Sequence, residues 1–304
     1  MTYTVIGTGA IGGYYGGKLA KAGRTVRFLL HTDYAYVKEH GLQIDSCDGS
    51  FHLDKIEAYN DTRLMPISDV ILVCLKSTNN HLLKEMLSPI TNERTTVVLI
   101  QNGIGLEEDL QTQFPSLHIV AGLAFICSGK VGPGHISHQC YGSINLGNFS
   151  CPDDLFSKLI VDFKDAGIIA TDVPYAEARW KKAVWNMPFN GMTVVLNTST
   201  DKLLNNPATR RLIYDLMMEV IDGAKAIGVT GVDKSFADKM IELTDAMVPY
   251  SPSMKLDYDY HRPMEIQYLY TRAITEVRKV GYDMPKLAML EAELRFIQSL
   301  YLDQ

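Results

Sequence analysis

The chain has few cysteines, no long apolar run and no excess of basic residues, and each of these shortages excludes a class of protein. Its five cysteines include no Cys-x-x-Cys pair, which argues against a disulfide framework and favours the reducing cytoplasm. No apolar run approaches the roughly 20 residues that span a bilayer, and no signal peptide is readable, so we expect no membrane partner. With a formal net charge of −6, the chain is also not expected to bind nucleic acid.

The first half of the 304 residues alternates short apolar runs with helical patterns. The runs are rich in Val, Ile and Leu without strict alternation, which is typical of strands buried on both faces of a parallel sheet. They occupy residues 3–6, 25–30, 70–75, 97–101 and 119–123. Helical patterns lie between them, for example over residues 10–21 and 79–87, so this half predicts a doubly wound α/β sheet.

From residue 129 the pattern changes, first to strands punctuated by glycines and then to helices. Residues 135–139 and 143–146 predict two separate antiparallel strands, and residues 168–171 predict the last strand. Beyond residue 174 the signals are helical, with caps or first-turn prolines at Asn206-Pro207, Asp233, Pro263 and Pro285. We therefore place a domain boundary at residue 172 and expect an all-helical second domain over residues 173–304.

A glycine-rich turn follows the first predicted strand and opens the first predicted helix. In this Gly-x-Gly-x-x-Gly motif, Gly7 permits a tight turn, Gly9 lets a pyrophosphate approach the backbone, and Gly12 lets the helix pack on the strand. Free N–H groups at the start of the helix favour phosphate. The motif predicts a Rossmann-type dinucleotide-binding domain over residues 1–172. The predicted cofactor-binding residues of this turn are Gly7, Thr8, Gly9, Ala10, Ile11 and Gly12.

The residues after the second predicted strand leave the choice of dinucleotide open. A basic group there would take a 2′-phosphate, and an acid would bind a ribose 2′-hydroxyl. His31 favours the first alternative and Asp33 the second, and both also fit an ordinary solvated loop. Lys76 and Asn102 each follow a later strand, at the end where an open parallel sheet binds its ligand, so we expect both near the cofactor.

One predicted helix after residue 174 carries a polar stripe. Lys182, Asn186 and Asn190 stay within about 80° of one another on a helix that turns about 100° per residue. Asn is a poor residue for a helix interior, so two of them in line with a lysine predict a polar cavity rather than a solvated face. Lys181 points away from this stripe, and Pro188 is expected to kink the helix.

These groups predict the site of a reductase. A lysine in a partly desolvated cleft has a lowered pKa and can protonate a carbonyl oxygen as hydride reaches the carbon, which makes Lys182 the candidate general acid. Glu265, in the first turn of the helix that Pro263 opens, is either a helix-start acid or an acceptor for a substrate hydroxyl. Ser251 and Ser253 precede that helix, where either could donate to a substrate carboxylate.

The motifs, taken in order, resemble the ketopantoate reductase (2-dehydropantoate 2-reductase) family over essentially the whole chain. Besides the opening glycines, the matching residues are Leu75-Lys76, Asn102-Gly103, Trp180, Lys182, Asn186, Asn190, Ser253-Met254, Arg262, Glu265 and Ile266. The resemblance implies NADPH (NADP+) as the cofactor. It also implies Lys182 as the general acid and Glu265 as the acceptor for the substrate hydroxyl. The family usually has arginine where this chain has His31.

The resemblance further implies which residues bind the ligands. It places Asn186 and Ser253 at the substrate, with Lys76 and Asn102 near the cofactor. Asn102 and Asn190 are additional candidates for substrate binding. We therefore expect NADPH-dependent reduction of ketopantoate to pantoate, with a small anionic keto acid as the partner.

Two alternatives remain open at this point, a reductase for another branched 2-keto acid and a non-catalytic NADP-binding sensor. The sensor would have little use for Lys182. No metal site is expected, because His135, His138 and Cys140 lie in a strand-like stretch that alternates faces. The sequence also leaves the oligomeric state open, with a homodimer as one option.

Overall fold

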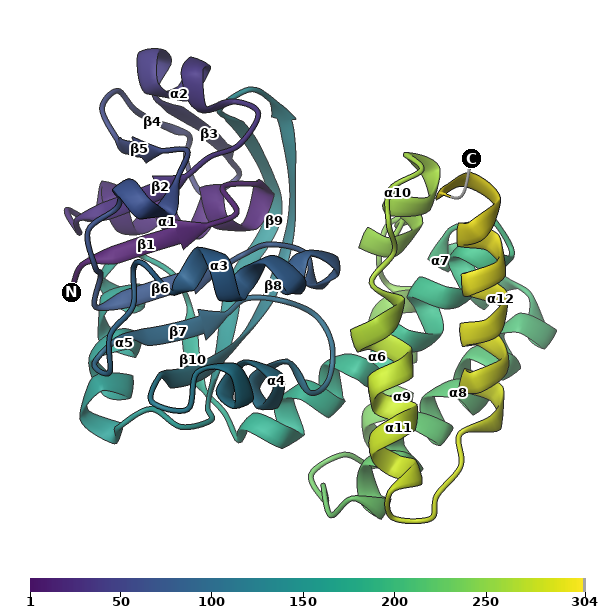
Figure 1. The fold of residues 1–304 in the computed structure, drawn as a ribbon. Helices are drawn as coiled ribbons and strands as arrows, with labels where there is room; N and C mark the ends of the chain where they lie inside the picture. Colours follow the sequence, from purple (N-terminus) through teal and green to yellow (C-terminus); the bar gives the residue numbers. More distant parts are fainter. Residues whose placement is uncertain (303–304) are drawn as a thin grey trace. The chain divides into compact units, whose positions relative to one another are not determined.

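The computed structural model describes residues 1–302 and divides into two compact units. The first unit contains Met1–Gln101 and Leu106–Tyr175, and the second contains Asn102–Gly105 and the chain from Ala176 onward. The first unit is an α/β domain built on one large sheet, and the second is helical, which confirms the predicted fold class (Figure 1). The chain changes unit three residues after the expected boundary at residue 172, where the first long helix of the second unit begins.

The sheet of the first unit has ten strands in the order β4-β3-β9-β8-β7-β6-β1-β2-β5, with β10 beside β9. Neighbouring strands from β8 to β5 are parallel, whereas β8 and β9 are antiparallel. The strands are β1 (Tyr3–Ile6), β2 (Val26–Leu29), β3 (Leu42–Ser46), β4 (Phe51–Leu53), β5 (Glu57–Tyr59), β6 (Val70–Val73), β7 (Thr96–Leu99), β8 (His118–Gly132), β9 (His135–Asn148) and β10 (Ala170–Asp172).

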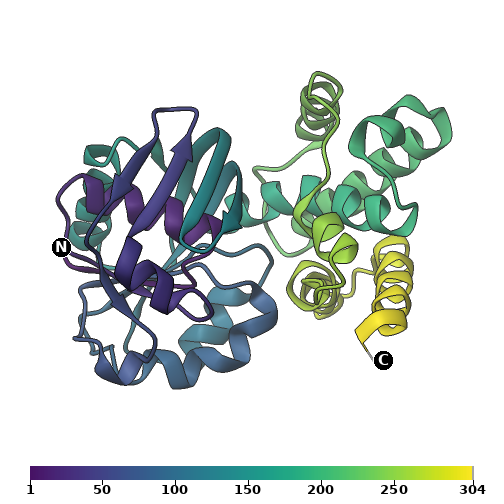
Figure 2. The same cartoon turned by 90° about the horizontal axis from the view of Figure 1, so that it is seen from above.

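The sheet curls around α1 (Ala10–Lys21), as the view from above shows (Figure 2). Glycines let the helix approach two parts of the sheet at once. A Cβ on Gly16 would lie 2.6 Å from Val5 of β1, and a Cβ on Gly13 would lie 2.7 Å from Ile136 of β9. The remaining helices of this unit are α2 (Tyr34–His40), α3 (Leu83–Leu87), α4 (Leu106–Gln113) and α5 (Asp153–Asp165), with 3₁₀ turns at Thr62–Leu64 and Ser77–Leu82.

The prediction of two short strands between glycines was wrong, because β9 is one continuous strand paired along nearly its whole length with β8. The pairing slips between Phe125 and Ile126, between Cys127 and Ser128, and once more before Gly132. Tyr141 and Gly142 have positive φ angles of 68° and 108° at the first slip. β-Bulges of this kind absorb glycines within a strand, so glycine did not mark strand ends here.

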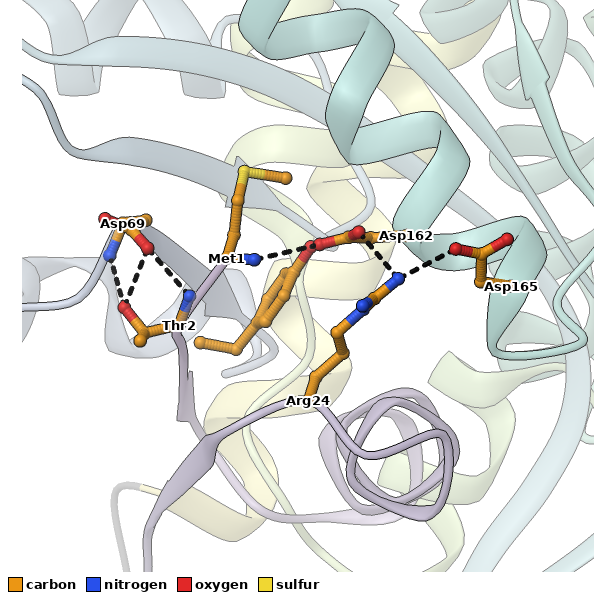
Figure 3. A network of polar contacts seen from close by, with 7 residues as sticks. Met1, Thr2, Arg24, Asp69, Asp162 and Asp165 are labelled. Atoms are coloured by element: carbon orange, nitrogen blue, oxygen red, sulfur yellow. Dashed lines mark hydrogen bonds and ion pairs between the residues drawn. The ribbon is translucent and has the colours of Figure 1, made fainter.

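An ionic network joins α5 to the start of the sheet (Figure 3). The Asp162 carboxylate accepts a hydrogen bond from the Tyr3 hydroxyl at 2.6 Å and lies 2.9 Å from the Arg24 guanidinium. Arg24 also reaches the exposed Asp165 at 2.8 Å. Burial, and then the Asp162 hydrogen bond, raise the pKa of the Tyr3 hydroxyl. The network therefore ties one partly buried carboxylate to two segments distant in the sequence.

The second unit packs helices around an apolar core that includes Phe189, Met217, Tyr270 and Leu290. Two predicted caps are confirmed: Asn206 accepts a hydrogen bond from Ala208 N–H, and Asp233 accepts one from Phe236 N–H. The helices are α6 (Tyr175–Val195), α7 (Thr200–Asn205), α8 (Pro207–Ala226), α9 (Lys234–Asp245), α10 (Ser253–Asp259), α11 (Arg272–Arg278) and α12 (Pro285–Leu302).

The helix that was expected to open at Pro263 begins later, so that prediction was wrong. A π-helical turn at Gln267–Thr271 leads directly into α11, and Glu265 lies just before it rather than in a first turn. The Glu265 carbonyl accepts a hydrogen bond from Leu269 N–H. Among residues 1–302, no helix combines the length and the apolar character that crossing a membrane requires.

Candidate active site

The glycine turn between β1 and α1 has the backbone that its motif predicts. Gly7 has a φ of 88°, and a Cβ there would lie 2.8 Å from Leu75 N at the end of β6. A Cβ on Gly12 would lie 2.3 Å from Gly7 O, so only glycine fits where the helix meets the strand. The Thr8 hydroxyl donates to Leu29 O at 2.8 Å and so fixes the turn against the end of β2.

Gly9 differs from the other two fingerprint glycines, because a Cβ there would meet no atom within 4 Å. Gly9 is also the N-cap of α1, and no side chain of the described residues caps this helix. The first N–H groups of a helix without a side-chain cap are free to bind an anion. The turn therefore offers the open space and the donors that a pyrophosphate needs.

The two residues that left the cofactor undecided are in different environments. His31 is exposed just after β2, whereas Asp33 is 6% exposed. The Asp33 carboxylate accepts a hydrogen bond from Gly134 N–H at 3.0 Å and lies 2.6 Å from the Lys130 amine. Asp33 thus anchors α2 to the turn between β8 and β9, and its charge is already compensated.

Lys76 lies at the end of β6, partly buried, and precedes the 3₁₀ turn Ser77–Leu82. The neighbouring side chain of Gln101 was not singled out from the sequence. Its amide donates to Leu75 O at 2.9 Å and to Asn80 Oδ1 at 2.7 Å, which fixes the ends of β6 and β7 beside the glycine turn. In the sequence, the only indication of this role was a glutamine at the end of an apolar run.

Asn102 follows β7 but belongs to the helical unit by its contacts. The segment Asn102–Gly105 packs on the π-helical turn, where Ile104 N–H donates to Tyr268 O at 2.9 Å. Gly103 has a φ of 126°, and a Cβ there would lie 2.6 Å from Tyr268. The packing therefore places Asn102 beside the segment that follows Glu265.

The polar stripe of α6 is mostly buried, as the prediction of a cavity requires. Asn186 is 8% exposed, Asn190 is 2% exposed, and Lys182 is partly buried. The pKa of Lys182 is lowered to about 7, first by burial and then by the neighbouring Arg179, and the charge of Glu265 opposes both effects. Glu265 is itself buried, so one amine and one carboxylate act on each other inside the helical unit.

The other predicted residues of this unit separate into two groups. Asn190 Oδ1 accepts a hydrogen bond from Met254 N–H at 3.0 Å, which holds the start of α10 and its exposed Ser253 against α6. Lys181 instead forms an ion pair with Glu177 on the same helix. The structure therefore fixes the residue after Ser253 to Asn190, and Lys181 lies on a different face of α6.

Tyr270 is a site neighbour that the sequence did not reveal. Its buried hydroxyl donates to Met187 O at 2.7 Å, and Gly191 N–H bonds to the same hydroxyl. Met187 and Gly191 are four residues apart on α6, so the hydroxyl stands within the helical ladder just after Pro188. This insertion links the π-helical turn after Glu265 to the helix that carries Lys182.

A glycine turn suited to pyrophosphate, a Rossmann-type sheet and a helical unit with a buried lysine define a dinucleotide-dependent oxidoreductase. A family model described as "Ketopantoate reductase PanE/ApbA" matches residues 3–150, and the model of its C-terminal part matches residues 175–298. The chain belongs to the ketopantoate reductase family and is an enzyme of that kind.

Individual relatives agree with this assignment. A 2-dehydropantoate 2-reductase from Nostoc sp. is 43% identical over 302 residues, which cover 97% of this chain and 94% of that protein. The crystal structure of 2-dehydropantoate 2-reductase from Geobacter metallireducens has a TM-score of 0.93 at 35% identity, covering 97% of this chain and 99% of the other. The enzyme from Methylococcus capsulatus has a TM-score of 0.91 at 30% identity, with 100% and 99% covered.

Proposed function

We propose that the protein reduces 2-dehydropantoate (ketopantoate) to pantoate with NADPH, and that Lys182 is the proton donor. The observation that carries this proposal is a partly buried lysine, with its pKa lowered to about 7, on the same stripe as two buried amides. An ordinary lysine, with a pKa near 10.5, would hold its proton too tightly at neutral pH to be an efficient acid. A lysine with a pKa near neutrality is suited to donate its proton in such a reaction.

The chemistry divides between the cofactor and this chain. When bound, the reduced nicotinamide supplies hydride to the keto carbon. The Lys182 Nζ then gives its proton to the former carbonyl oxygen, so that no alkoxide accumulates. Asn186 and Ser253 donate hydrogen bonds to the substrate, and Asn102 and Asn190 are the other polar groups proposed for binding it. Glu265 accepts a hydrogen bond from the substrate hydroxyl.

The residues after β2 support NADPH rather than NADH. Asp33 is buried, bonded to Gly134 N–H and paired with Lys130, so its carboxylate is occupied by the fold. An exposed histidine, His31, stands at the position where a basic group would meet a 2′-phosphate. The Lys76 side chain is proposed as a further cofactor contact, at the end of the strand that borders the glycine turn.

Steady-state turnover on a panel of 2-keto acids with both dinucleotides tests the proposal. We expect the highest kcat/KM with ketopantoate and NADPH, and a lower value with the branched keto acid that lacks the 4-hydroxyl. Glu265→Gln should reduce turnover of ketopantoate much more than turnover of the keto acid without the hydroxyl, which it affects only through the pKa of Lys182. Absence of turnover with every keto acid of the panel would refute the reductase function, and preference for NADH would refute the cofactor.

A further inference from the structure

A second group of ligand-bearing side chains lies in the first unit, where β3 ends beside β9. Cys47 and Asp48 follow β3, and His138 lies on β9. One ligand atom from each residue lies within 4.8 Å of those of the other two. None of these residues belongs to the proposed hydride-transfer site. We propose that Cys47, Asp48 and His138 form a binding site for a divalent transition-metal ion of the zinc type.

Two of the three ligand pairs lie near the spacing that a tetrahedral ion requires. Cys47 Sγ lies 3.9 Å from His138 Nε2 and 3.8 Å from Asp48 Oδ1. With metal–sulfur bonds of about 2.3 Å and metal–nitrogen or metal–oxygen bonds of about 2.0–2.2 Å, such ligand pairs on zinc lie roughly 3.5 Å apart. These two pairs need a contraction of a few tenths of an ångström, and the third pair, Asp48 and His138, lies within 4.8 Å. Cys47 and Asp48 are exposed, so their side chains have room to rotate towards the ion.

Neighbouring groups orient the imidazole for binding. Ser46 Oγ lies 2.8 Å from His138 Nδ1, and Asp48 N–H donates to the same oxygen at 3.1 Å. Cys47 Sγ is also 3.8 Å from Nδ1, but the shorter contact to Ser46 occupies that nitrogen. When Nδ1–H donates to Ser46, Nε2 keeps its lone pair for a metal. A second partner that fixes the other ring nitrogen is usual for metal-binding histidine.

The backbone makes the arrangement rigid. Cys47 N–H donates to His138 O at 3.1 Å. The backbone hydrogen bonds that pair β3 with β9 therefore extend to two of the proposed ligand residues. His138 is 2% exposed and lies against Tyr14, their ring centroids 4.4 Å apart. Gly142 keeps the space beside the imidazole clear, because a Cβ there would lie 3.3 Å from Nε2. The histidine is therefore buried and fixed, and the other two ligands face solvent.

The ligand types select the class of ion. A thiolate and an imidazole favour zinc or cobalt over magnesium and calcium, which prefer oxygen ligands. A thiolate and a carboxylate together also balance the charge of a divalent ion. Three protein ligands leave a fourth position for water at the exposed side. The strand alternation considered in the sequence separates His135 from this group, and His135 instead pairs with Asp45.

The test uses cobalt(II) as a spectroscopic probe on the full-length, untagged and reduced protein. We expect saturation at one equivalent, with visible bands of tetrahedral cobalt and a thiolate-to-cobalt charge-transfer band, all abolished by added zinc(II). Cys47→Ser should remove the charge-transfer band and weaken binding at least about tenfold. The matched control is Cys151→Ser, which replaces a buried cysteine beyond the C-terminal end of β9. This variant should retain both the charge-transfer band and the wild-type affinity for cobalt.

Further variants keep the test independent of folding. Replacing the buried His138 risks unfolding the sheet, so Asp48→Asn and Ser46→Ala, both in or beside the exposed turn, are measured alongside Cys47→Ser. Each should weaken cobalt binding about tenfold with unchanged circular dichroism. Equal binding by the Cys47→Ser and Cys151→Ser proteins, or no saturation at one equivalent, would overturn the proposal. None of these readouts depends on reductase turnover.

Discussion

Lys130 forms an ion pair with Asp33, and its amine lies 2.6 Å from the carboxylate. Lys130 is on β8 and Asp33 follows β2, so the pair joins two distant parts of the first unit. Because Gly134 N–H also donates to this carboxylate, the acid that would favour NAD is committed to the fold. Under the proposed function, we therefore expect exposed groups after β2, His31 foremost among them, to determine the cofactor.

A set of variants at these two positions tests that inference. His31→Arg should raise kcat/KM for NADPH about tenfold without changing that for NADH, since a charge-assisted bond to a phosphate contributes about 1.5–3 kcal/mol. Asp33→Asn should lower thermal stability and leave the NADPH/NADH ratio unchanged. A ratio that changes strongly with Asp33→Asn and little with His31→Arg would show that Asp33, not His31, selects the cofactor.

The lowered pKa of Lys182 should make the protein less stable at neutral and acidic pH than at alkaline pH. Its folded pKa is about 7 against an ordinary value of 10.5, so between these values the unfolded chain binds more protons and stability rises with pH. We expect the effect of Lys182→Met on stability to be more favourable at pH 6 than at pH 9 by about 2–3 kcal/mol. Urea unfolding at both pH values measures this difference. A variant whose gain in stability is independent of pH would contradict the lowered pKa.

Removing the Tyr270 hydroxyl should cost stability. Tyr270→Phe leaves the Met187 carbonyl and the Gly191 N–H of α6 without their buried partner, and we expect a loss of about 1–3 kcal/mol. Tyr301→Phe is the control, because its hydroxyl also donates to a carbonyl, Arg262 O, but in an exposed position. Chemical denaturation should find the control within about 0.5 kcal/mol of wild type. Equal losses of stability in the Tyr270→Phe and Tyr301→Phe proteins would contradict the inference that the Tyr270 hydroxyl is inserted into the hydrogen-bond ladder of α6.

The Asp162 network offers a paired test within one cluster (Figure 3). Asp162→Ala removes the partner of both Tyr3 and Arg24, and we expect a loss of about 2–4 kcal/mol because two partly buried polar groups lose their bonds. Asp165→Ala removes only an exposed ion pair with Arg24 and should cost less than about 1 kcal/mol. Thermal melting measures the stability of both variants. A larger loss of stability for Asp165→Ala than for Asp162→Ala would contradict the finding that Asp162 is the more buried partner of Arg24.

Long-range periodicity made much of the fold predictable from sequence. β1 and α1 occupy the predicted residues, β2 and β6 lie within predicted apolar runs, and β7 overlaps another, since burial on both faces demands such runs. The strands β3, β4 and β5 were not predicted; β4 and β5 have three residues each, and their stability comes from pairing with a neighbour rather than from their own composition. The length of β9 was underestimated because the glycines at its bulges resemble strand ends.

The candidate site was predictable to the extent that it lies on one helix or one turn. Helix geometry placed Lys182, Asn186 and Asn190 on one stripe, and their burial agrees with it. The partners of Asp33 and the insertion of Tyr270 could not be anticipated, because each joins residues far apart in the sequence through a side chain. Glu265 was placed inside a helix because Pro263 resembles a first-turn proline, but the helical turn starts at Gln267.

The pH dependence of kcat/KM for ketopantoate at saturating NADPH, compared between wild type and Lys182→Ala, tests the proposed proton transfer. A protonated Lys182 is the acid, so the wild-type value should be constant below pH 7 and fall as the pH rises above it. Lys182→Ala should be slower by about 10²–10⁴ and should lose this decline, with the Kd for NADPH unchanged. A Lys182→Ala protein that keeps both the wild-type rate and the decline above pH 7 would show that another group supplies the proton.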